Sequence, residues 1–171
     1  LDVWKVKGFD NLIRAWGKIA KQYPEWNLMI AGTGTPKSKK YLTDLVEQEH
    51  IGDSVSFVGF CNNIIDYYRK ASIFVLSSRY EGFGMVLTEA MSQGCACIAC
   101  DFNGRQREII QNDDQGIVCS NDNYLELAEA IKKMIDDDEY REHCRMHAVE
   151  RSKYYELDKT IDRWEQIFQT L

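Results

Sequence analysis

Short apolar segments alternate with amphipathic segments of helical periodicity along most of this chain. Strands are expected at the short apolar segments 26–31, 55–58, 73–76, 96–99 and 116–119, of which 73–76 also has the β-branched content of a buried strand. Helices are expected around and between them, at 9–22, 38–50, 64–71, 85–93, 107–111 and 124–135. Strands joined through helices run parallel, because right-handed crossovers return the chain to the same end of the sheet, and the helices then cover both faces. The sequence therefore predicts an α/β fold, a Rossmann-like doubly wound parallel sheet.

The carboxyl-terminal residues depart from this alternation. No strand-like segment occurs between 139 and 171, and the sequence predicts extra C-terminal helices there, two in number. The second carries an apolar stripe at helical spacing, formed by Ile161, Trp164, Ile167 and Phe168. Such a stripe needs a partner, and two remain open: the sheet of its own domain, or a surface outside this sequence. We therefore divide the chain into a Rossmann-like domain at 1–154 and a terminal helix at 155–171.

Length and charge narrow the class of protein. The 171 residues suit one domain with a sizeable core. The formal net charge is -6 and no segment is rich in lysine and arginine, which argues against nucleic acid as a partner. No apolar stretch has membrane-spanning length and no signal-peptide pattern is present, so we expect no transmembrane segment and a cytoplasmic location. Leu1 stands where an initiator methionine would be expected, so the sequence reads as a piece of a longer protein.

The six cysteines lie mostly within apolar segments instead of between turns, so reduced and buried thiols are expected. A zinc site at Cys95, Cys97 and Cys100 is disfavoured, because strand alternation sends Cys100 to the face opposite the other two. His143 and His147 stand four positions apart, a spacing able to hold zinc, but a polar helix face is the preferred interpretation. No metal ligands are predicted.

The strand at 73–76 leads into a glycine-rich turn and then a helix, and two glutamates, Glu81 and Glu89, stand eight positions apart in this segment. The first amides of a helix have no partner within it and lie at the positive end of its dipole, so they suit a phosphate group. Ionised carboxylates only accept hydrogen bonds, so a glutamate on each side suits hydroxyl groups. A hexose and a ribose flank the diphosphate of a nucleotide sugar, and the segment therefore predicts a nucleotide-sugar site. Gly82 and Gly84 would let the backbone approach the diphosphate, although a simple turn predicts glycine equally well.

Three further loops follow predicted strands and would share one edge of the sheet. They contain Gly32 and Gly34, then the pair Gly59 and Phe60, and then residues 101–105. Ligands of open α/β sheets lie beyond the carboxyl ends of the strands, so these loops converge on the same crevice. Phe60 would lie beside the base of the nucleotide, or would be a core aromatic at the end of its strand.

Several segments together are similar to those of a known family. The run Glu81-Gly82-Phe83-Gly84-Met85-Val86-Leu87-Thr88-Glu89 resembles the E-x7-E motif of the retaining GT-B glycosyltransferases of family GT4, also called group 1. Four more segments resemble the carboxyl-terminal, donor-binding domain of that family in order and spacing: Lys7-Gly8-Phe9-Asp10, Ala31-Gly32-Thr33-Gly34, 55–59 and 89–94. The resemblance covers nearly the whole chain.

The resemblance implies the reaction and the residues that serve it. It implies a retaining, metal-independent transfer of a hexosyl group from a UDP- or GDP-sugar, UDP favoured, to a glycan or lipid-linked acceptor in polysaccharide biosynthesis. Lys7 and Glu81 would be catalytic, with Lys7 at the diphosphate and Glu81 at the hexose hydroxyls, while Glu89 would accept from the ribose. The implied donor-binding residues are Gly32, Gly34, Phe60, Gly82, Phe83, Gly84, Met85, Val86 and Glu89. No cofactor and no metal are expected, since no DxD-type pair follows a strand. By composition alone, Lys7 and the two glutamates would be solvated side chains.

The resemblance also implies a second domain. GT-B enzymes carry the acceptor site and a catalytic histidine in an amino-terminal domain, which is missing from this sequence. The chain alone would then bind nucleotide weakly and transfer nothing. The terminal helix would cross back to the missing domain, and peripheral contact with a membrane would come only through that domain.

One segment departs from the family. Residues 101–110 contain bulky and basic side chains, among them Arg105 and Arg107, where the family has a small-residue turn, so the donor sugar is left unassigned. Arg105 would touch phosphate or acceptor, or be an ordinary surface arginine. Two other classes of protein stay open: a non-catalytic α/β interaction module, and a GT-B sugar-nucleotide epimerase or phosphorylase-like enzyme.

Overall fold

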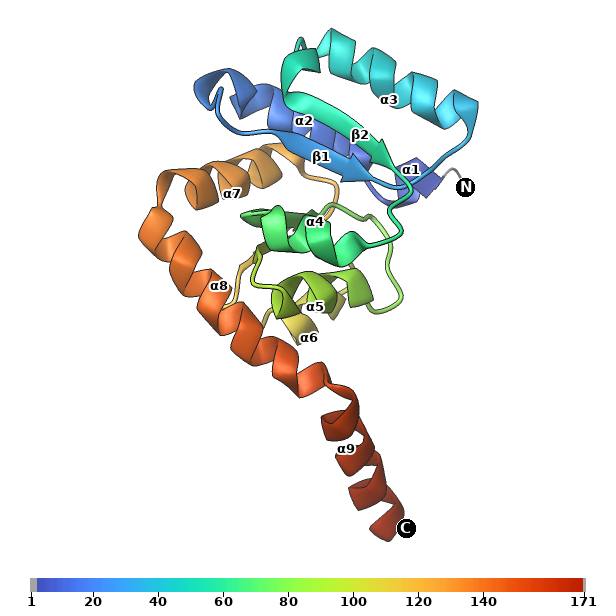
Figure 1. Cartoon of the computed structure of the whole chain (residues 1–171), viewed down its shortest axis with the longest axis vertical. Coiled ribbons are helices and arrows are strands. Elements are labelled where there is room, and N and C mark those ends of the chain that lie inside the picture. The colour runs from blue at the N-terminus through green and yellow to red at the C-terminus, as the bar shows by residue number, and fades with distance from the viewer. Residues whose placement is uncertain (1–2, 171) are drawn as a thin grey trace.

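The computed structural model describes residues 3–170 (Figure 1). The helices are α1 Val3–Val6, α2 Phe9–Ile19, α3 Pro36–Gln48, α4 Ile64–Lys70, α5 Met85–Ser92, α6 Arg105–Ile109, α7 Tyr124–Asp136, α8 Asp138–Ser152 and α9 Leu157–Gln169. The strands are β1 Leu28–Ala31, β2 Val55–Gly59, β3 Ile73–Leu76, β4 Ala96–Cys100 and β5 Ile117–Cys119. Every predicted strand and helix is present with small shifts at its ends, and α1 is an addition. The outer limits of the two predicted domains, 1 and 171, lie outside the described residues.

The strands pair in parallel, as their alternation with helices predicts, and the Rossmann-like α/β class is confirmed. Two hydrogen-bonded groups are formed: β1 pairs with β2, and β3, β4 and β5 pair in that order. The alternation alone predicts one continuous sheet, whereas the ladder between residues 3 and 170 is interrupted between β1 and β3. A cavity of about 840 Å³, lined largely by apolar side chains, lies between these two strands.

Strand β4 is the centre of the three-stranded group, and all five of its residues are at most 1% exposed. Ile98 and Cys100 belong to the hydrophobic cluster that contains α2 and α7, whereas Cys97 and Ala99 belong to the cluster that contains α5. Cys95, just ahead of the strand, shares the cluster of Cys97, so the predicted alternation of these cysteines is confirmed. A strand covered on both faces is what a doubly wound sheet requires.

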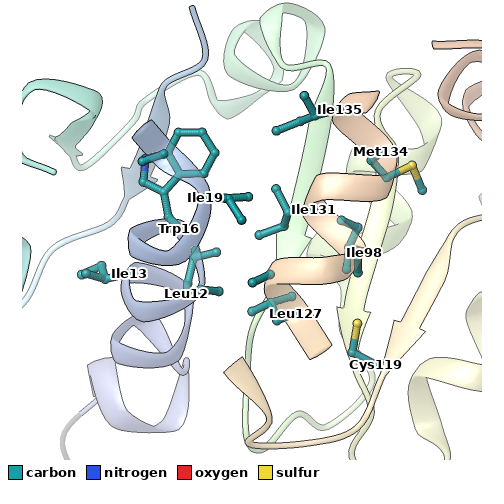
Figure 2. Close-up of a cluster of buried hydrophobic side chains, with 14 of the residues drawn as sticks. Leu12, Ile13, Trp16, Ile19, Ile98, Cys119, Leu127, Ile131, Met134 and Ile135 are labelled. Atoms are coloured by element: carbon teal, nitrogen blue, oxygen red, sulfur yellow. The ribbon is translucent and has the colours of Figure 1, made fainter. Parts of the chain in front are cut away.

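Helices α2 and α7 pack against each other on one face of the sheet (Figure 2). Ile19 of α2 points toward Ile131 of α7, whereas Ile13 points to the opposite side of α2. Ile98 and Cys119 lie beyond α7, on the strands. Each fully buried aliphatic side chain contributes about 1.5–3 kcal/mol, so this contact is a major source of stability. Helix α2 follows directly on Lys7 and Gly8, which is the residue that caps its amino end.

We expect alkylation of a single thiol in the folded protein. All six cysteines are free; five are buried, and Cys61 is partly exposed. Burial raises the pKa of Cys95 and Cys100 to about 11 and that of Cys119 to about 12, so these thiols carry little reactive thiolate at pH 8. Iodoacetamide at pH 8 should therefore add one label per folded chain, measured by intact mass, and reach every cysteine after unfolding in guanidinium. Cys61→Ser is the control and should abolish the native label, whereas two or more native labels would show that the buried thiols are accessible.

Helix α9 projects away from the rest of the molecule beyond the end of α8 (Figure 1). None of its residues is buried, and Trp164 of the predicted apolar stripe is 55% exposed. The stripe therefore does not pack on the sheet of its own domain, which excludes that alternative for the described chain. Among helices within residues 3–170, none combines the length and apolar character needed to cross a membrane.

Candidate functional site

The candidate site lies where β3 ends and α5 begins. Gly84 is the residue that caps the amino end of α5, and its φ of 93° lies in the left-handed region that favours glycine. Its carbonyl accepts a hydrogen bond from the amide of Leu87 at 2.8 Å, which starts the helix. The strand, turn and helix predicted from the sequence are therefore confirmed. The free amides at the head of α5 face the same edge of the fold as the ends of the parallel strands.

Lys7 and Glu81 meet at this turn although 74 positions separate them in the sequence. The Nζ atom of Lys7 donates to Oε1 of Glu81 at 2.7 Å, and the side chains are 38% and 11% exposed. The Ser78 hydroxyl donates to the same Oε1 at 2.7 Å. Across the described residues no hydrogen bond reaches Oε2 of Glu81, so this oxygen can accept from a hydroxyl of a ligand. The pair places one positive and one negative group side by side at the glycine turn.

A close backbone contact brings Lys7 to this position. Gly8 has a φ of 65°, and a Cβ atom on it would lie 1.9 Å from the carbonyl oxygen of Ser77. The Ser77 hydroxyl also donates to the carbonyl of Lys7 at 2.9 Å. Only glycine permits this approach, because any side chain would collide with the backbone at the end of β3. The glycine after Lys7 is therefore a requirement of the packing and not only of a turn.

Arg79 holds the surrounding loops together, a role that no sequence pattern predicted. Its guanidinium donates to both carboxylate oxygens of Asp10, at 2.7 and 2.9 Å, and to Asp122 at 2.6 Å. Its amide donates to the carbonyl of Val6 at 2.8 Å. The hydrogen bonds to Asp10 and Asp122 raise the pKa of Arg79, so it stays charged. The arginine thus fixes the segment around Lys7 against the loop after β3. No signal in the sequence identifies it, because both carboxylates are distant along the chain.

Glu89 has a different neighbour. It lies on α5, partly buried, and its Oε2 accepts a hydrogen bond from the Tyr68 hydroxyl of α4 at 3.3 Å. Burial, followed by the charge of Glu89, raises the pKa of Tyr68, so the phenol remains a donor. Among the described residues, Glu81 and Glu89 share no hydrogen-bond partner. Lys7, Tyr68 and Val86 all line the cavity between β1 and β3, and neither glutamate does.

The glycines at the ends of β1 and β2 lie together. The amide of Gly32, which has a φ of 135°, donates to the carbonyl of Gly59 at 2.8 Å, so the two loops are joined. Gly32 also lines the cavity between β1 and β3, whereas Gly34 does not. Phe60 follows Gly59 and is 75% exposed, which excludes the alternative that it is a core aromatic. The ring is therefore free to stack on a planar ligand group.

The apolar residues of the E-x7-E segment are exposed to different degrees. Met85 and Val86, at the head of α5, are 67% and 37% exposed. Phe83 packs edge-on against Tyr155, with 5.6 Å between the ring centroids, and so contacts the segment that leads to α9. Gly82 has open space around its Cα. Of this group, Val86 alone also lines the cavity between β1 and β3.

The segment that departs from the family lies against the glycine turn. Arg105 is exposed, as its interpretation as a surface arginine predicts, and it donates to the carbonyl of Gly82 at 2.9 Å. Gln106 is fully buried, and its Oε1 accepts from the amide of Phe102 at 2.7 Å. Its Nε2 has no hydrogen-bond partner within residues 3–170 and lies 4.0 Å from the place that a Cβ on Gly84 would take. Arg105 and Gln106 of this segment therefore lie against the glycine turn, at Gly82 and Gly84.

Comparisons with known proteins show which chains are similar to this one. A glycosyltransferase of Haemophilus influenzae, named as uncharacterized, is 30% identical over 165 residues, which are 96% of this chain and 46% of that protein. The crystal structure of the C-terminal domain of a glycosyl transferase group 1 family protein, LpcC of Francisella tularensis, is 31% identical with a TM-score of 0.82 and covers 90% of this chain and 82% of that one. Anabaena Alr3699/HepE, solved in complex with UDP, shares the fold at 21% identity and a TM-score of 0.88, over 97% of this chain and 46% of its own.

The chain thus spans about half the length of the Haemophilus relative and of the Anabaena protein. It corresponds to the carboxyl-terminal half of such proteins, as its likeness to the isolated Francisella domain indicates. A protein-family model described as glycosyl transferases group 1 matches residues 3–151, which is most of the sequence. By this match the chain belongs to the glycosyl transferases group 1 family.

Proposed function

We propose that this chain is the donor-binding domain of a retaining, metal-independent hexosyltransferase that uses a nucleotide diphosphate sugar, with UDP as the favoured nucleotide. The observation that carries the proposal is the contact of Lys7 with Glu81 beside the left-handed Gly84 at the head of α5. It assembles a cation, a carboxylate and free helix amides at the edge of the sheet where ligands of this fold class bind. The UDP complex of Anabaena HepE supports a nucleotide ligand for the same fold.

Each residue has a task that follows from its charge and position. When the bond between the anomeric carbon and the diphosphate breaks, negative charge grows on the leaving phosphate and positive charge on the sugar. The Lys7 ammonium and the amides at the head of α5 stabilise the phosphate, so no metal ion is needed for that charge. Glu81 accepts a sugar hydroxyl through Oε2 and places a negative charge near the sugar. Glu89 accepts from the ribose, and exposed Phe60 stacks on the base.

The proposal extends to the whole protein. The acceptor, a glycan or a lipid-linked sugar in polysaccharide biosynthesis, would bind an amino-terminal domain facing the donor site, so this chain alone would bind donor without transferring it. The exposed apolar face of α9, which includes Trp164, would contact that domain. Six free thiols, five of them buried, suit a reducing cytoplasmic location.

Nucleotide binding to the full-length protein tests the proposal. Calorimetry with UDP, GDP and ADP should give a binding signal at millimolar nucleotide or below, strongest for UDP. Lys7→Gln should weaken UDP binding by roughly 10- to 100-fold, because a charge-assisted hydrogen bond to the diphosphate is lost. The matched control is Lys40→Gln, which removes an exposed lysine that pairs with Asp44 on α3 and should leave binding unchanged.

Two results would contradict it. Absence of heat with all three nucleotides would favour the non-catalytic interaction module over a transferase. If the Lys7→Gln and Lys40→Gln variants bind UDP with equal affinity, Lys7 does not bind the diphosphate. Analysis of products formed by the full-length protein separates a transferase from an epimerase.

A further inference from the structure

Tyr68 of α4 is a buried side chain whose hydroxyl donates to Glu89. The residue is 6% exposed and belongs to the hydrophobic cluster that contains α5. Its ring packs edge-on against Phe74 of β3, with 5.6 Å between the ring centroids, and its carbonyl accepts from the Sγ atom of Cys95 at 3.1 Å. Both the ring and the backbone are therefore anchored, and the hydroxyl is a donor in a fixed position.

This hydroxyl joins two helices that lie side by side, α4 and α5 (Figure 1). Its acceptor is Oε2 of Glu89, at 3.3 Å. A buried tyrosine hydroxyl needs such a partner, because leaving it without one costs free energy. A phenylalanine ring would fill the same space between the helices, so what the hydroxyl adds to the packing of Tyr68 is its contact with Glu89.

The Glu89 carboxylate keeps its charge and one free oxygen. No basic side chain of the described residues forms an ion pair with it, since Arg69, next to Tyr68 on α4, donates instead to the side-chain oxygen of Gln93 at 3.0 Å. Within residues 3–170 no hydrogen bond reaches Oε1 of Glu89. A neutral donor therefore orients this carboxylate without cancelling its charge, and it leaves Oε1 able to accept from a ligand.

An oriented carboxylate suits a pair of adjacent hydroxyl groups. An unrestrained glutamate on a helix surface loses rotamer freedom when it binds a ligand, and this loss weakens binding. A hydrogen bond from a fixed donor removes that freedom before the ligand arrives. Ribose carries hydroxyls on two adjacent carbons, and the two oxygens of one carboxylate can accept from both. The orientation of Glu89 therefore bears on how strongly a ribose is preferred to a sugar that lacks one of these hydroxyls.

We propose that Tyr68 is a positioning residue whose hydroxyl holds the Glu89 carboxylate ready for the 2′ and 3′ hydroxyls of a ribonucleotide, and that it thereby sets the preference for ribose over 2′-deoxyribose. This inference rests on the proposed function, because it takes Glu89 as the residue that binds the ribose. Tyr68 acts only through Glu89 and does not touch the nucleotide. The segment from Phe60 to Tyr68 then serves the nucleoside at both of its ends, with Phe60 at the base and Tyr68 behind the residue at the ribose.

Calorimetry of the full-length protein with UDP and with 2′-deoxy-UDP tests the proposal. The wild type should bind UDP more tightly by about 10-fold or more, because 2′-deoxy-UDP lacks one hydrogen bond to a charged group. Tyr68→Phe keeps the ring that packs on Phe74, and it should weaken UDP binding by about 3- to 10-fold and 2′-deoxy-UDP binding by less. The matched control is Tyr67→Phe, the same change one position earlier on α4, where the hydroxyl has no hydrogen-bond partner within residues 3–170. It should leave the preference for UDP unchanged.

A double-mutant cycle separates positioning from packing. In a Glu89→Ala protein the Tyr68 hydroxyl has nothing to position, so adding Tyr68→Phe should change the affinity for either nucleotide by no more than about twofold. A purely structural role of the hydroxyl predicts a different pattern, in which Tyr68→Phe weakens the binding of UDP and of 2′-deoxy-UDP equally, with or without Glu89. Thermal unfolding of each variant without nucleotide shows that the compared proteins are folded.

The outcomes separate this inference from the function on which it rests. If the wild type prefers UDP and Tyr68→Phe keeps the whole preference, Tyr68 does not position Glu89, and the proposed donor site is unaffected. If the wild type binds both nucleotides equally, Glu89 does not accept from the 2′ hydroxyl, and the inference is wrong although the protein binds nucleotide. If neither nucleotide binds, the inference and the proposed function are both wrong.

Discussion

Replacing Glu81 with glutamine in the full-length protein should lower kcat by roughly 10²- to 10³-fold, the size typical of removing one group that stabilises charge in a transition state. The substitution keeps the shape of the side chain and an oxygen that can accept from Ser78, so the turn should be preserved. It removes the negative charge that stands beside the developing positive charge of the sugar, and it leaves Lys7 without its counter-charge. The measurement is steady-state transfer with the donor nucleotide sugar.

The pattern of kinetic constants separates catalysis from structure. If Glu81 acts on the transition state, kcat falls while the affinity for UDP changes little, because UDP lacks the sugar that Glu81 contacts. If Glu81 only holds the turn, UDP affinity and thermal stability fall together with kcat. Glu47→Gln, an exposed glutamate on α3, is the matched control and should leave kcat unchanged. If kcat of the Glu81→Gln variant lies within threefold of the wild-type value, Glu81 does not take part in the reaction.

The strands show what local sequence can predict. The β3 segment from Ile73 to Leu76 matches its predicted limits because a polar or glycine-rich stretch bounds the apolar run on each side. Strand β1 begins at Leu28, two residues later than its apolar run, since its start is set by the register with Val55 of β2. Periodicity reports which face a residue prefers, but the partner strand decides where pairing begins.

The interruption between β1 and β3 has no signal in the sequence. Both strands carry the apolar pattern of sheet interiors, and that pattern is the same whichever strand lies beside them. Pairing is a contact between segments distant along the chain, so composition and spacing do not report it. The alternation of strands and helices predicts the class of fold, and only the structure shows that β1 and β3 do not pair with each other.

In the candidate site, too, some features follow from the sequence and others depend on contacts between distant segments. Its two charged residues, Lys7 and Glu81, and the glycine turn were identified by resemblance to a family, and the strand, turn and helix around them follow from local patterns. Their direct contact, the tether formed by Arg79 with Asp10, and the buried amide of Gln106 all depend on segments that are far apart in the chain. The periodicity of a sequence does not predict contacts between segments that are far apart in the chain.

Gly8→Ala should be the most damaging of the small substitutions in this region. The alanine Cβ would lie 1.9 Å from the Ser77 carbonyl oxygen, and the φ of 65° adds the strain of a left-handed residue. The segment must then move away from β3, which breaks the hydrogen bond from the Arg79 amide to Val6 and that from the Ser77 hydroxyl to Lys7. The expected loss in the free energy of unfolding is about 2–4 kcal/mol, within the range for strain combined with broken hydrogen bonds. For a domain of this size that is a fall in Tm of about 5–15 °C.

The control must carry the same chemical change without the collision. Gly52→Ala meets this condition, because nothing lies within 4 Å of the new Cβ and the residue has no left-handed φ. Its stability should stay within about 0.5 kcal/mol of the wild type, measured by urea unfolding of both variants. The movement of residue 8 also carries Lys7 away from Glu81, so Gly8→Ala should weaken UDP binding even at temperatures where the protein stays folded. If the Gly8→Ala protein is as stable as the Gly52→Ala protein, residue 8 does not pack closely against Ser77 at the end of β3. The contact between Lys7 and Glu81 would then not depend on that packing.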